Sequence, residues 1–164
     1  MNRAHDWQLA RIKAHLVESA EVKQRTIEQC AGPISAAAEM IAETFQAGGK
    51  LLLCGNGGSA ADCQHMAAEF VNRLNADTPR QGLPALALTT DTSFITSFAN
   101  DVGFEGVFAR QIQALGTAHD VLLAISTSGG SPNILQAIET AHSMGMNTIA
   151  LTTAKSWDLI ASIV

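Results

Sequence analysis

A chain of 164 residues is long enough for one domain with a sizeable core, and its hydrophobic share of 47% is that of a soluble globular protein. The formal net charge is −5, and the ten Lys and Arg residues are spread along the chain, which excludes a basic stripe for a nucleic-acid backbone. No apolar run approaches the roughly 20 residues of a membrane-spanning helix. The start, Met1–Asp6, leads into a mixed polar segment without the apolar core of an export signal. We therefore expect a cytoplasmic protein that binds neither nucleic acid nor membrane.

The first segment of the chain is predicted to be helical. Apolar residues recur there at helical spacing and carry the pattern to about Cys30: Leu9, Ile12, Leu16, Ala20 and Ile27. We expect Gly32-Pro33 to end this helix and Pro33 to open a second one, which Gly48-Gly49 stops. This long helix or helix pair precedes the first strand. We expect the first helix to pack against another copy of the protein, with packing inside its own chain as the open alternative.

The next stretch combines a buried strand, a glycine loop and a helix. Leu51–Cys54 is a continuous apolar run of the kind found in parallel sheets, and Gly55–Ser59 follows it at once. Glycines let the backbone turn sharply and approach a ligand closely. Ser59 is the predicted N-cap of the helix, so backbone N–H groups there face an expected anion.

His65 and Glu69 lie four residues apart on that helix. They fall on a different side from its apolar members, which are Cys63, Met66, Ala67, Phe70 and Leu74. Residues at this spacing stack on one face, so both side chains can reach a single metal ion or substrate. A solvent-exposed pair on an ordinary helix is the equally open alternative, because such contacts are common.

Strands and helices alternate through the rest of the chain. The first predicted elements are a strand within Gly82–Thr89 and a short helix capped by Asp91 or Thr92 and running through Phe98. A turn at Asn100–Gly103 and an amphipathic helix from Phe104 to a stop at Gly116 follow. The last predicted elements are a strand at Val121–Ile125, a helix from Pro132 to near Gly145 and a strand at Asn147–Leu151. Alternation implies parallel pairing, so we expect a single α/β domain, a three-layer sandwich with a parallel sheet flanked by helices. Residues 1–48 would form its N-terminal helices and residues 49–164 its core.

A second loop, Ser126–Pro132, holds four hydroxyl side chains and two glycines before a proline-started helix with Ser131 as its predicted N-cap. Ligands are expected at the carboxyl ends of parallel strands, where both loops lie. Hydroxyls, backbone N–H groups and a helix dipole can hold a phosphate without Lys or Arg. A serine-rich turn with a helix cap is the alternative, but this loop is longer and richer in donors than a cap requires.

The cysteines, Cys30, Cys54 and Cys63, are odd in number and lack CxxC spacing, which predicts free, mostly buried thiols.

Gly55–Ala60 also fits the G-x-G-x-x-A dinucleotide fingerprint, which predicts an oxidoreductase. Its acidic partner, Asp91, comes about 35 residues after Gly55 where roughly 20 are expected, and the fingerprint leaves the His65 and Glu69 pair unexplained. We therefore rank the dinucleotide interpretation low.

Four ordered motifs closely resemble those of bacterial phosphoheptose isomerases, which are sugar isomerase (SIS) domain proteins. They are CGNGGSAADCQHMAAE at Cys54–Glu69, LTTD at Leu88–Asp91, AND at Ala99–Asp101 and AISTSGGSPN at Ala124–Asn133. The similarity covers the chain from about Leu51 to Leu151. It implies a SIS-type fold and a zinc-dependent isomerase of sedoheptulose 7-phosphate, usually a homotetramer with sites between subunits, that serves heptose synthesis for the cell envelope.

The resemblance also implies roles for individual residues. His65 matches a zinc ligand, and Glu69 matches both a zinc ligand and the acid/base that moves a proton between C1 and C2. The positions that match substrate binding are Asn56, Gly57, Gly58, Glu69, Asn100 and Asp101, and those that match the phosphate cradle are Ser126, Thr127, Ser128 and Ser131. An aldose–ketose isomerisation needs a base and a group that stabilises the enediolate oxygens, which a carboxylate beside a metal supplies.

The sequence departs from the family pattern towards its end. Thr152–Trp157 stands where the family usually has Thr-Gly and a further glycine-rich turn. Val164 is the last residue here, whereas family members continue with a strand and a helix that provide more zinc ligands and a histidine acid/base, and neither His119 nor His142 fits those positions. Because two protein ligands are fewer than the three of a catalytic zinc, we expect activity to require that segment.

A non-catalytic SIS protein, either a regulator that binds sugar phosphates or a replication initiator-associating relative, is the alternative; Glu69 favours the enzyme.

Overall fold

The computed structural model describes residues 3–75, 77 and 79–153. By its internal contacts the chain forms two units, Met1–Glu39 and Met40–Val164. The described residues of the first unit belong to one helix, and the second unit holds the sheet and the other described helices. Among the described helices, none combines the length and the hydropathy that a membrane crossing requires.

Helix α1 (Arg3–Gln46) is continuous, so the predicted break at Gly32-Pro33 is wrong. A proline inside a helix lacks one N–H donor, and its ring crowds the carbonyl four residues back. That loss concerns a single bond of the helix, and the run that follows includes three alanines, Ala36–Ala38, which have the highest helix propensity. The predicted stop is confirmed, because Gly48 takes a φ of 81° just after the helix ends.

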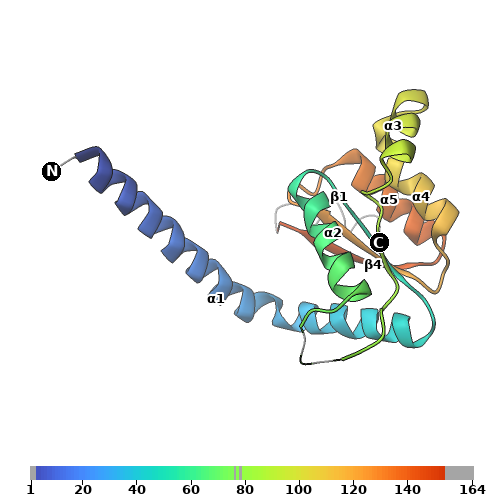
Figure 1. Ribbon diagram of the computed structural model, residues 1–164, viewed down its shortest axis with the longest axis horizontal. Coiled ribbons are helices and arrows are strands. Elements are labelled where there is room, and N and C mark those ends of the chain that lie inside the picture. Colours follow the sequence, from blue (N-terminus) through green and yellow to red (C-terminus); the bar gives the residue numbers. More distant parts are fainter. Residues whose placement is uncertain (1–2, 76, 78, 154–164) are drawn as a thin grey trace. The chain divides into compact units, whose positions relative to one another are not determined.

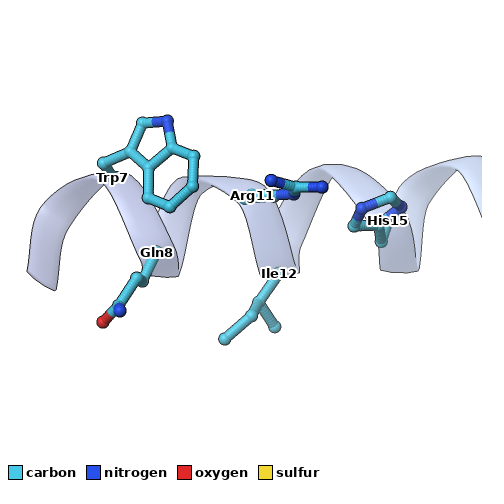
Figure 2. A pocket seen from close by; sticks show the side chains of 5 residues that line it. All are labelled: Trp7, Gln8, Arg11, Ile12 and His15. Carbon is cyan, nitrogen blue, oxygen red and sulfur yellow. The ribbon is translucent and has the colours of Figure 1, made fainter. Parts of the chain in front are cut away.

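The first unit keeps its large apolar side chains exposed. They are Trp7, Leu9, Ile12, Leu16, Val17, Val22, Ile27 and Ile34. The Arg11 guanidinium lies over the Trp7 ring, 5.5 Å from its centroid, and Figure 2 shows His15 farther along the same side of the helix. A hollow of about 350 Å³ is lined there by Trp7, Gln8, Arg11, Ile12 and His15. Since all five residues belong to one helix, the hollow has no opposite wall and is a helix surface rather than an enclosed site.

Four parallel strands form the sheet of the second unit. They are β1 (Leu51–Gly55), β2 (Ala85–Ala87), β3 (Val121–Ser126) and β4 (Asn147–Thr152), in the order β2-β1-β3-β4. Leu51 pairs with Val121 at one end of β1 and β3, and Gly55 pairs with Ile125 at the other. Every residue of these two central strands is buried, as expected for strands covered on both faces.

The remaining helices are α2 (Gly58–Val71), α3 (Thr92–Asp101), the 3₁₀ turn η1 (Phe104–Gly106), α4 (Val107–Leu115) and α5 (Pro132–Ser143). Their order matches the prediction, but two boundaries differ near β1. The strand predicted within Gly82–Thr89 is reduced to β2, because Pro84 has no N–H for the ladder and a turn follows Ala87. The prediction of Ser59 as N-cap is wrong, because Gly57 takes that place with a φ of 55°.

Around α3 the prediction is right at the start of the helix and wrong at its end. Asp91 is the N-cap, and its Oδ1 accepts a hydrogen bond from the Phe94 N–H at 2.9 Å. The helix continues through Asn100 and Asp101, where the sequence predicts a turn. The chain turns only at Gly103, whose φ of 135° favours glycine.

Helices cover both faces of the sheet, which confirms the three-layer sandwich (Figure 1). Between the sheet and helices α4 and α5 lie Leu52, Cys54, Leu122, Ala124, Val107, Phe108, Ile112, Ile134 and Ile138. Between the opposite face and α2 lie Leu51, Leu53, Cys63, Ala67, Val121, Leu123 and Ile125, against which Met40, Ile41 and Phe45 of α1 also pack. Leu74, predicted on the apolar face of α2, lies beyond the end of the helix and is 76% exposed.

The three thiols are free, as predicted, and two of them are buried. Burial, with the nearby Cys63 thiol as a smaller cause, raises the pKa of Cys54 far above its usual range. Burial, with Asp62 as a smaller cause, raises the pKa of Cys63 to about 11. Both thiols are therefore protonated at neutral pH and act as core residues, whereas Cys30 is exposed.

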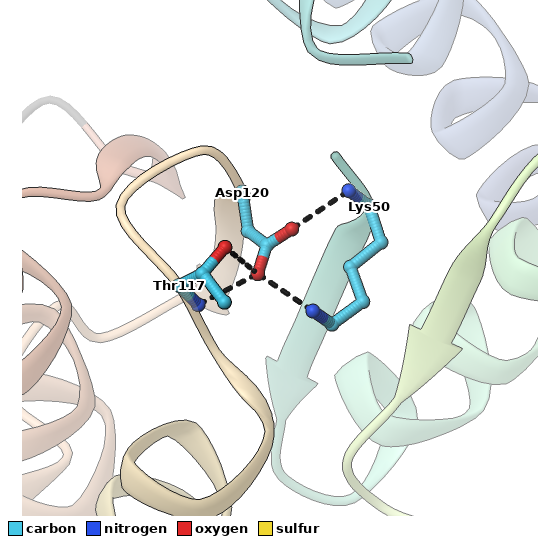
Figure 3. A network of polar contacts seen from close by, with 3 residues as sticks. All are labelled: Lys50, Thr117 and Asp120. Carbon is cyan, nitrogen blue, oxygen red and sulfur yellow. Dashed lines mark hydrogen bonds and ion pairs between the residues drawn. The ribbon is translucent and has the colours of Figure 1, made fainter. Parts of the chain in front are cut away.

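At the amino edge of the sheet, Asp120 ties the start of β1 to the start of β3 (Figure 3). Its oxygens accept hydrogen bonds from Lys50 N–H at 2.8 Å, Lys50 Nζ at 2.7 Å, Thr117 N–H at 2.7 Å and Thr117 Oγ1 at 3.0 Å. Burial by itself raises the pKa of this carboxyl, but the hydrogen bonds from Lys50 and Thr117 outweigh burial and hold the pKa below its usual value.

Candidate functional site

The strand order determines where a ligand can bind. β1 has β2 on one side and β3 on the other, so the segments that follow β1 and β3 leave the carboxyl edge in neighbouring positions. Open α/β sheets with this order bind ligands at the switch point between these two strands. The glycine loop (residues 55–59) and the hydroxyl loop (residues 126–131) both lie there.

The fold requires two glycines in the glycine loop. A Cβ on Gly55 would lie 2.8 Å from the Ser59 carbonyl oxygen, so only glycine lets α2 begin this close to the end of β1. Gly57, with its positive φ, caps α2 without a side-chain hydrogen bond. The backbone N–H groups that open α2 therefore start directly at the loop, where they can meet an anion.

The hydroxyl loop gathers its side chains at the start of α5. Ser126 is 5% exposed, and its Oγ lies 3.2 Å from Ser131 Oγ across the loop. Gly129 turns the chain with a φ of 64°, and its N–H donates to the Ser126 carbonyl at 3.2 Å. Ser131 is the N-cap of α5, as predicted, but its hydroxyl makes no capping bond to the helix. Thr127 and Ser128 are exposed, so the loop presents hydroxyls at a helix N-terminus.

A pair of carboxamides links the two loops. Asn56 Nδ2 donates to Asn133 Oδ1 at 2.9 Å, and Asn133 Nδ2 donates to Asn56 Oδ1 at 2.8 Å. Asn133 stands in the first turn of α5 and is 3% exposed. Sequence reasoning gave Asn133 no role, although it is the last residue of the motif AISTSGGSPN and a polar residue directly ahead of the apolar side of the helix.

A cleft of about 120 Å³ opens beside the glycine loop. It is lined by Gly55, Asn56, Gly57, Ala60, Thr89, Ile95, Phe104, Val107 and Phe108. Two predicted substrate-binding residues, Asn56 and Gly57, thus lie in its wall. Its far side is apolar and is formed by Ile95 of α3, Phe104 of η1 and Val107 and Phe108 of α4, none of which sequence reasoning identified as a site residue. Thr89, also missed, accepts a hydrogen bond from Gln64 Nε2 at 3.2 Å and so ties the end of the second strand to α2.

His65 and Glu69 stack on α2 as their spacing predicts. The distance from His65 Nε2 to Glu69 Oε1 is 3.7 Å, and the side chains are 76% and 31% exposed. Glu69 Oε2 is nevertheless buried, and it has no hydrogen-bond partner among the described residues. Arg80 fixes the backbone at this point, since its guanidinium donates to the carbonyls of Glu69 at 2.6 Å and Phe70 at 2.7 Å.

Other predicted site residues lie outside the cleft wall. Asn100 and Asp101 are exposed in the last turn of α3, and Asn100 Nδ2 donates to Asp101 Oδ1 at 2.8 Å. Thr152, at the end of β4, pairs in register with Ser126, and its buried Oγ1 has no hydrogen-bond partner in the described part of the chain. The rest of the departure predicted at the chain's end, residues 154–157, lies outside the described residues.

The dinucleotide interpretation loses its acidic residue. β2 is the strand after the fingerprint, and the ribose ligand of such sites ends that strand with a free carboxylate. Asp91 instead comes after the turn that follows β2, and its Oδ1 caps α3. The glycine loop is therefore left with the chemistry of an anion or sugar site.

Comparison with known proteins identifies the family. The SIS domain model matches residues 15–153. The chain is 53% identical to a phosphoheptose isomerase of Roseiflexus sp., over 94% of this chain and 75% of that protein, and 52% identical to one of Azoarcus sp., over 87% and 71%. Two solved phosphoheptose isomerases share the fold. The one from Neisseria gonorrhoeae has a TM-score of 0.87 and 44% identity, over 96% of this chain and 80% of that one. The one from Francisella tularensis has a TM-score of 0.86 and 40% identity, over 91% of this chain and 77% of that one. The chain therefore belongs to the SIS domain family, among the phosphoheptose isomerases.

Proposed function

We propose that this isomerase interconverts sedoheptulose 7-phosphate and a glycero-manno-heptose 7-phosphate and thereby supplies heptose for the cell envelope. The names of the relatives and the four ordered motifs support the reaction class. The hydroxyl loop supports a phosphate on the substrate, because it offers neutral donors at the N-terminus of α5. The cleft beside the glycine loop supports a sugar chain bound next to Asn56 and Gly57.

The observation that carries the proposal is the state of the Glu69 carboxylate. One of its oxygens, Oε2, is buried without a hydrogen-bond partner among the described residues, and the other lies 3.7 Å from His65 Nε2. A buried polar atom without a partner costs on the order of 1–3 kcal/mol. A bound cation or a proton taken from a substrate would remove that cost, so Glu69 is suited to be both a ligand and a base.

In the proposed reaction the Glu69 carboxylate takes a proton from C1 of the ketose. The electron pair of the broken C1–H bond forms the C1–C2 double bond, the π pair of the C2–O2 carbonyl moves onto O2, and a proton passes from the O1 hydroxyl to O2, which gives an enediolate. An electron pair of O1 then forms the C1–O1 double bond, and the C1–C2 pair takes the proton back from Glu69 at C2, which gives the aldose. A single carboxylate on one face of the enediol can serve both transfers, and no atom is gained or lost.

The donor set of this helix fits zinc in part. His65 and Glu69 provide an imidazole nitrogen and a carboxylate, which are donor types that zinc binds. Within residues 3–75, 77 and 79–153, no third His, Cys, Asp or Glu joins them. We therefore propose that these two residues hold zinc together with donors outside that set. When bound, zinc would supply a Lewis acid for the carbonyl oxygen of the sugar.

The position of Glu69 on α2 supports a site shared between subunits of a homotetramer. Glu69 stands eleven residues beyond Gly58, about 16 Å along the helix at 1.5 Å per residue. A heptose phosphate is roughly 10 Å long when extended, by ordinary bond lengths. The glycine loop and Glu69 of one chain are thus too far apart to contact the same substrate. If Glu69 of one subunit faces the glycine loop of another, both can contact it. The exposed apolar side chains of α1 supply a surface for such an assembly.

The test is turnover of sedoheptulose 7-phosphate by the zinc-loaded protein and its Glu69→Gln variant. We expect the variant to lose at least about 10²-fold in kcat, the usual loss on removing a general base, and to bind less zinc. Glu139→Gln, an exposed change on α5, should alter neither quantity. Wild-type turnover in the variant would refute the role of Glu69. Binding of the sugar phosphate by the wild-type protein without turnover would favour either the non-catalytic alternative or an activity that requires the further segment of the family. The zinc content of the two proteins then tests the role of Glu69.

A further inference from the structure

We propose that Asn133 is a positioning residue for the isomerisation. Its carboxamide holds Asn56, and with it the glycine loop, at a fixed distance and orientation from the hydroxyl loop. The identity of the substrate in this inference rests on the proposed function. The role of the pair rests on its own geometry.

The two carboxamides form a closed pair. Each donates one N–H to the oxygen of the other, at 2.8 and 2.9 Å, across 77 residues of sequence. Hydrogen bonds between side chains are only about 10–15% of those in folded proteins, and a reciprocal pair is more restrictive than a single bond because both amide planes must align. The pair therefore fixes the orientation of both side chains as well as their separation.

The two members of the pair have different access to a ligand. A carboxamide has two N–H donors and two acceptor lone pairs, and the pair uses one of each on either side. Asn133 is 3% exposed and is absent from the cleft wall, whereas Asn56 is half-buried and lines the cleft. The remaining N–H and lone pair of Asn56 are thus the ones that a substrate can reach. Asn133 acts through Asn56.

The loop needs this support because the sheet ends at its first residue, Gly55. The ladder between β1 and β3 joins Gly55 to Ile125 and goes no further along β1. Beyond that point come residues that include Gly57 and Gly58, and glycine backbones have the greatest conformational freedom. The carboxamide pair continues the connection one residue past the ladder, from the glycine loop to the first turn of α5. A substrate that contacts both loops then meets them at a set spacing.

The test is a double-mutant cycle on the zinc-loaded protein, with Asn56→Ala, Asn133→Ala and the double variant. We expect either single variant to raise KM for sedoheptulose 7-phosphate about tenfold, the scale of two lost hydrogen bonds, and to leave kcat within about threefold because Glu69 is untouched. Since Asn133 acts through Asn56, the double variant should be no worse than Asn56→Ala. The affinity for inorganic phosphate, which the hydroxyl loop holds, should stay within about twofold.

A matched control and a second readout separate positioning from stability. Asn147→Ala changes an exposed asparagine at the amino edge of the same sheet and should leave KM unchanged. Amide hydrogen exchange should rise at Gly57 and Gly58 in Asn133→Ala and stay unchanged in the core strands. The inference would be overturned if the KM increase in the double variant equalled the product of the increases in the two single variants. It would also be overturned if amide hydrogen exchange in Asn133→Ala rose evenly through the core. If the wild-type protein does not turn over sedoheptulose 7-phosphate, KM cannot be measured, and exchange at the glycine loop alone decides the role of Asn133, separately from the proposed function.

Discussion

Replacing Asp120 with Asn tests whether a buried ion pair holds the amino edge of the sheet together. In the folded protein the two carboxylate oxygens accept four hydrogen bonds, two from Lys50 and two from Thr117, and the side chain is 2% exposed. A carboxamide has one acceptor oxygen, so Asp120→Asn brings its N–H₂ group against at least one of these donors. It also leaves the Lys50 ammonium without its counter-charge.

The expected loss is a few kcal/mol. A hydrogen bond to a charged group contributes about 1.5–3 kcal/mol, and breaking one side of a buried pair costs about 3–5 kcal/mol because a charge is left unpaired. Lys50 is 30% exposed and can regain water, so we take the lower part of these ranges, about 2–4 kcal/mol. Urea unfolding at pH 7 and equal protein concentration measures the difference, with the exposed change Asp77→Asn as a control near zero.

The pH dependence provides a second check with a defined sign. The folded pKa of Asp120 lies below the value of about 3.9 for an unfolded aspartate. The stabilisation is therefore complete above that unfolded value and is lost as pH falls through the folded pKa. We expect the gap in unfolding free energy between wild type and Asp120→Asn to narrow over this acidic range. A gap that stays constant from pH 7 to the acid transition, or one below about 0.5 kcal/mol at pH 7, would refute the reasoning.

Two further predictions concern the ligand site and the assembly. Ser126→Ala removes one hydroxyl of the proposed cradle and should weaken inorganic phosphate binding about three- to tenfold in calorimetry, which is the scale of one hydrogen bond. Ser143→Ala, at the far end of α5, should leave the affinity unchanged. Equal phosphate affinities of the wild-type protein and Ser126→Ala would place the phosphate elsewhere. Leu16→Lys puts a charge on the exposed apolar side chains of α1 and should lower the mass found by light scattering, whereas Glu139→Lys on α5 should keep it. A monomeric wild-type protein would contradict the proposed tetramer.

The strands and the two loops were predictable because their signals are local. Val121–Ile125 is an uninterrupted apolar run, and in the structure all of it is buried in β3. Such runs are long enough to mark a strand covered on both faces, and glycines directly after them mark the turn. The same signals predicted the parallel sheet, its flanking helices and the edge where ligands bind.

The errors arose where two local preferences compete. Gly32-Pro33 predicts a break, but the helix-forming residues on both sides of it carry α1 through. Ser59 is a good N-cap by residue type, yet Gly57 takes the position because it can adopt a positive φ and Ser59 cannot do so cheaply. Likewise, α3 continues through the first residues of the predicted turn, Asn100 and Asp101, and the chain turns only at the last one, Gly103, where a positive φ is available.

Asn133 could not have been found in this way. Its partner is 77 residues distant, and its environment exists only once β1 and β3 pair. A polar residue in the first turn of a helix is ordinary, since that position is commonly solvated. The same holds for the cleft wall from α3, η1 and α4, whose apolar residues read as core in the sequence.

Side-chain hydrogen bonds thus connect β1 and β3 beyond both ends of their ladder, by Lys50 and Asp120 at the amino edge and by Asn56 and Asn133 at the carboxyl edge. Adjacent strands lie about 4.8 Å apart, and this spacing is passed on to the loops only if the backbone beyond the ladder is restrained. The amino-edge pair lies at the end of the sheet opposite the two loops and contributes stability. The carboxyl-edge pair lies where two loops meet one substrate, so the same kind of contact there sets the geometry of binding. Asp120→Asn should therefore lower the unfolding free energy, and Asn133→Ala should raise KM. An effect of Asp120→Asn on KM alone, or of Asn133→Ala on the unfolding free energy alone, would contradict these separate roles.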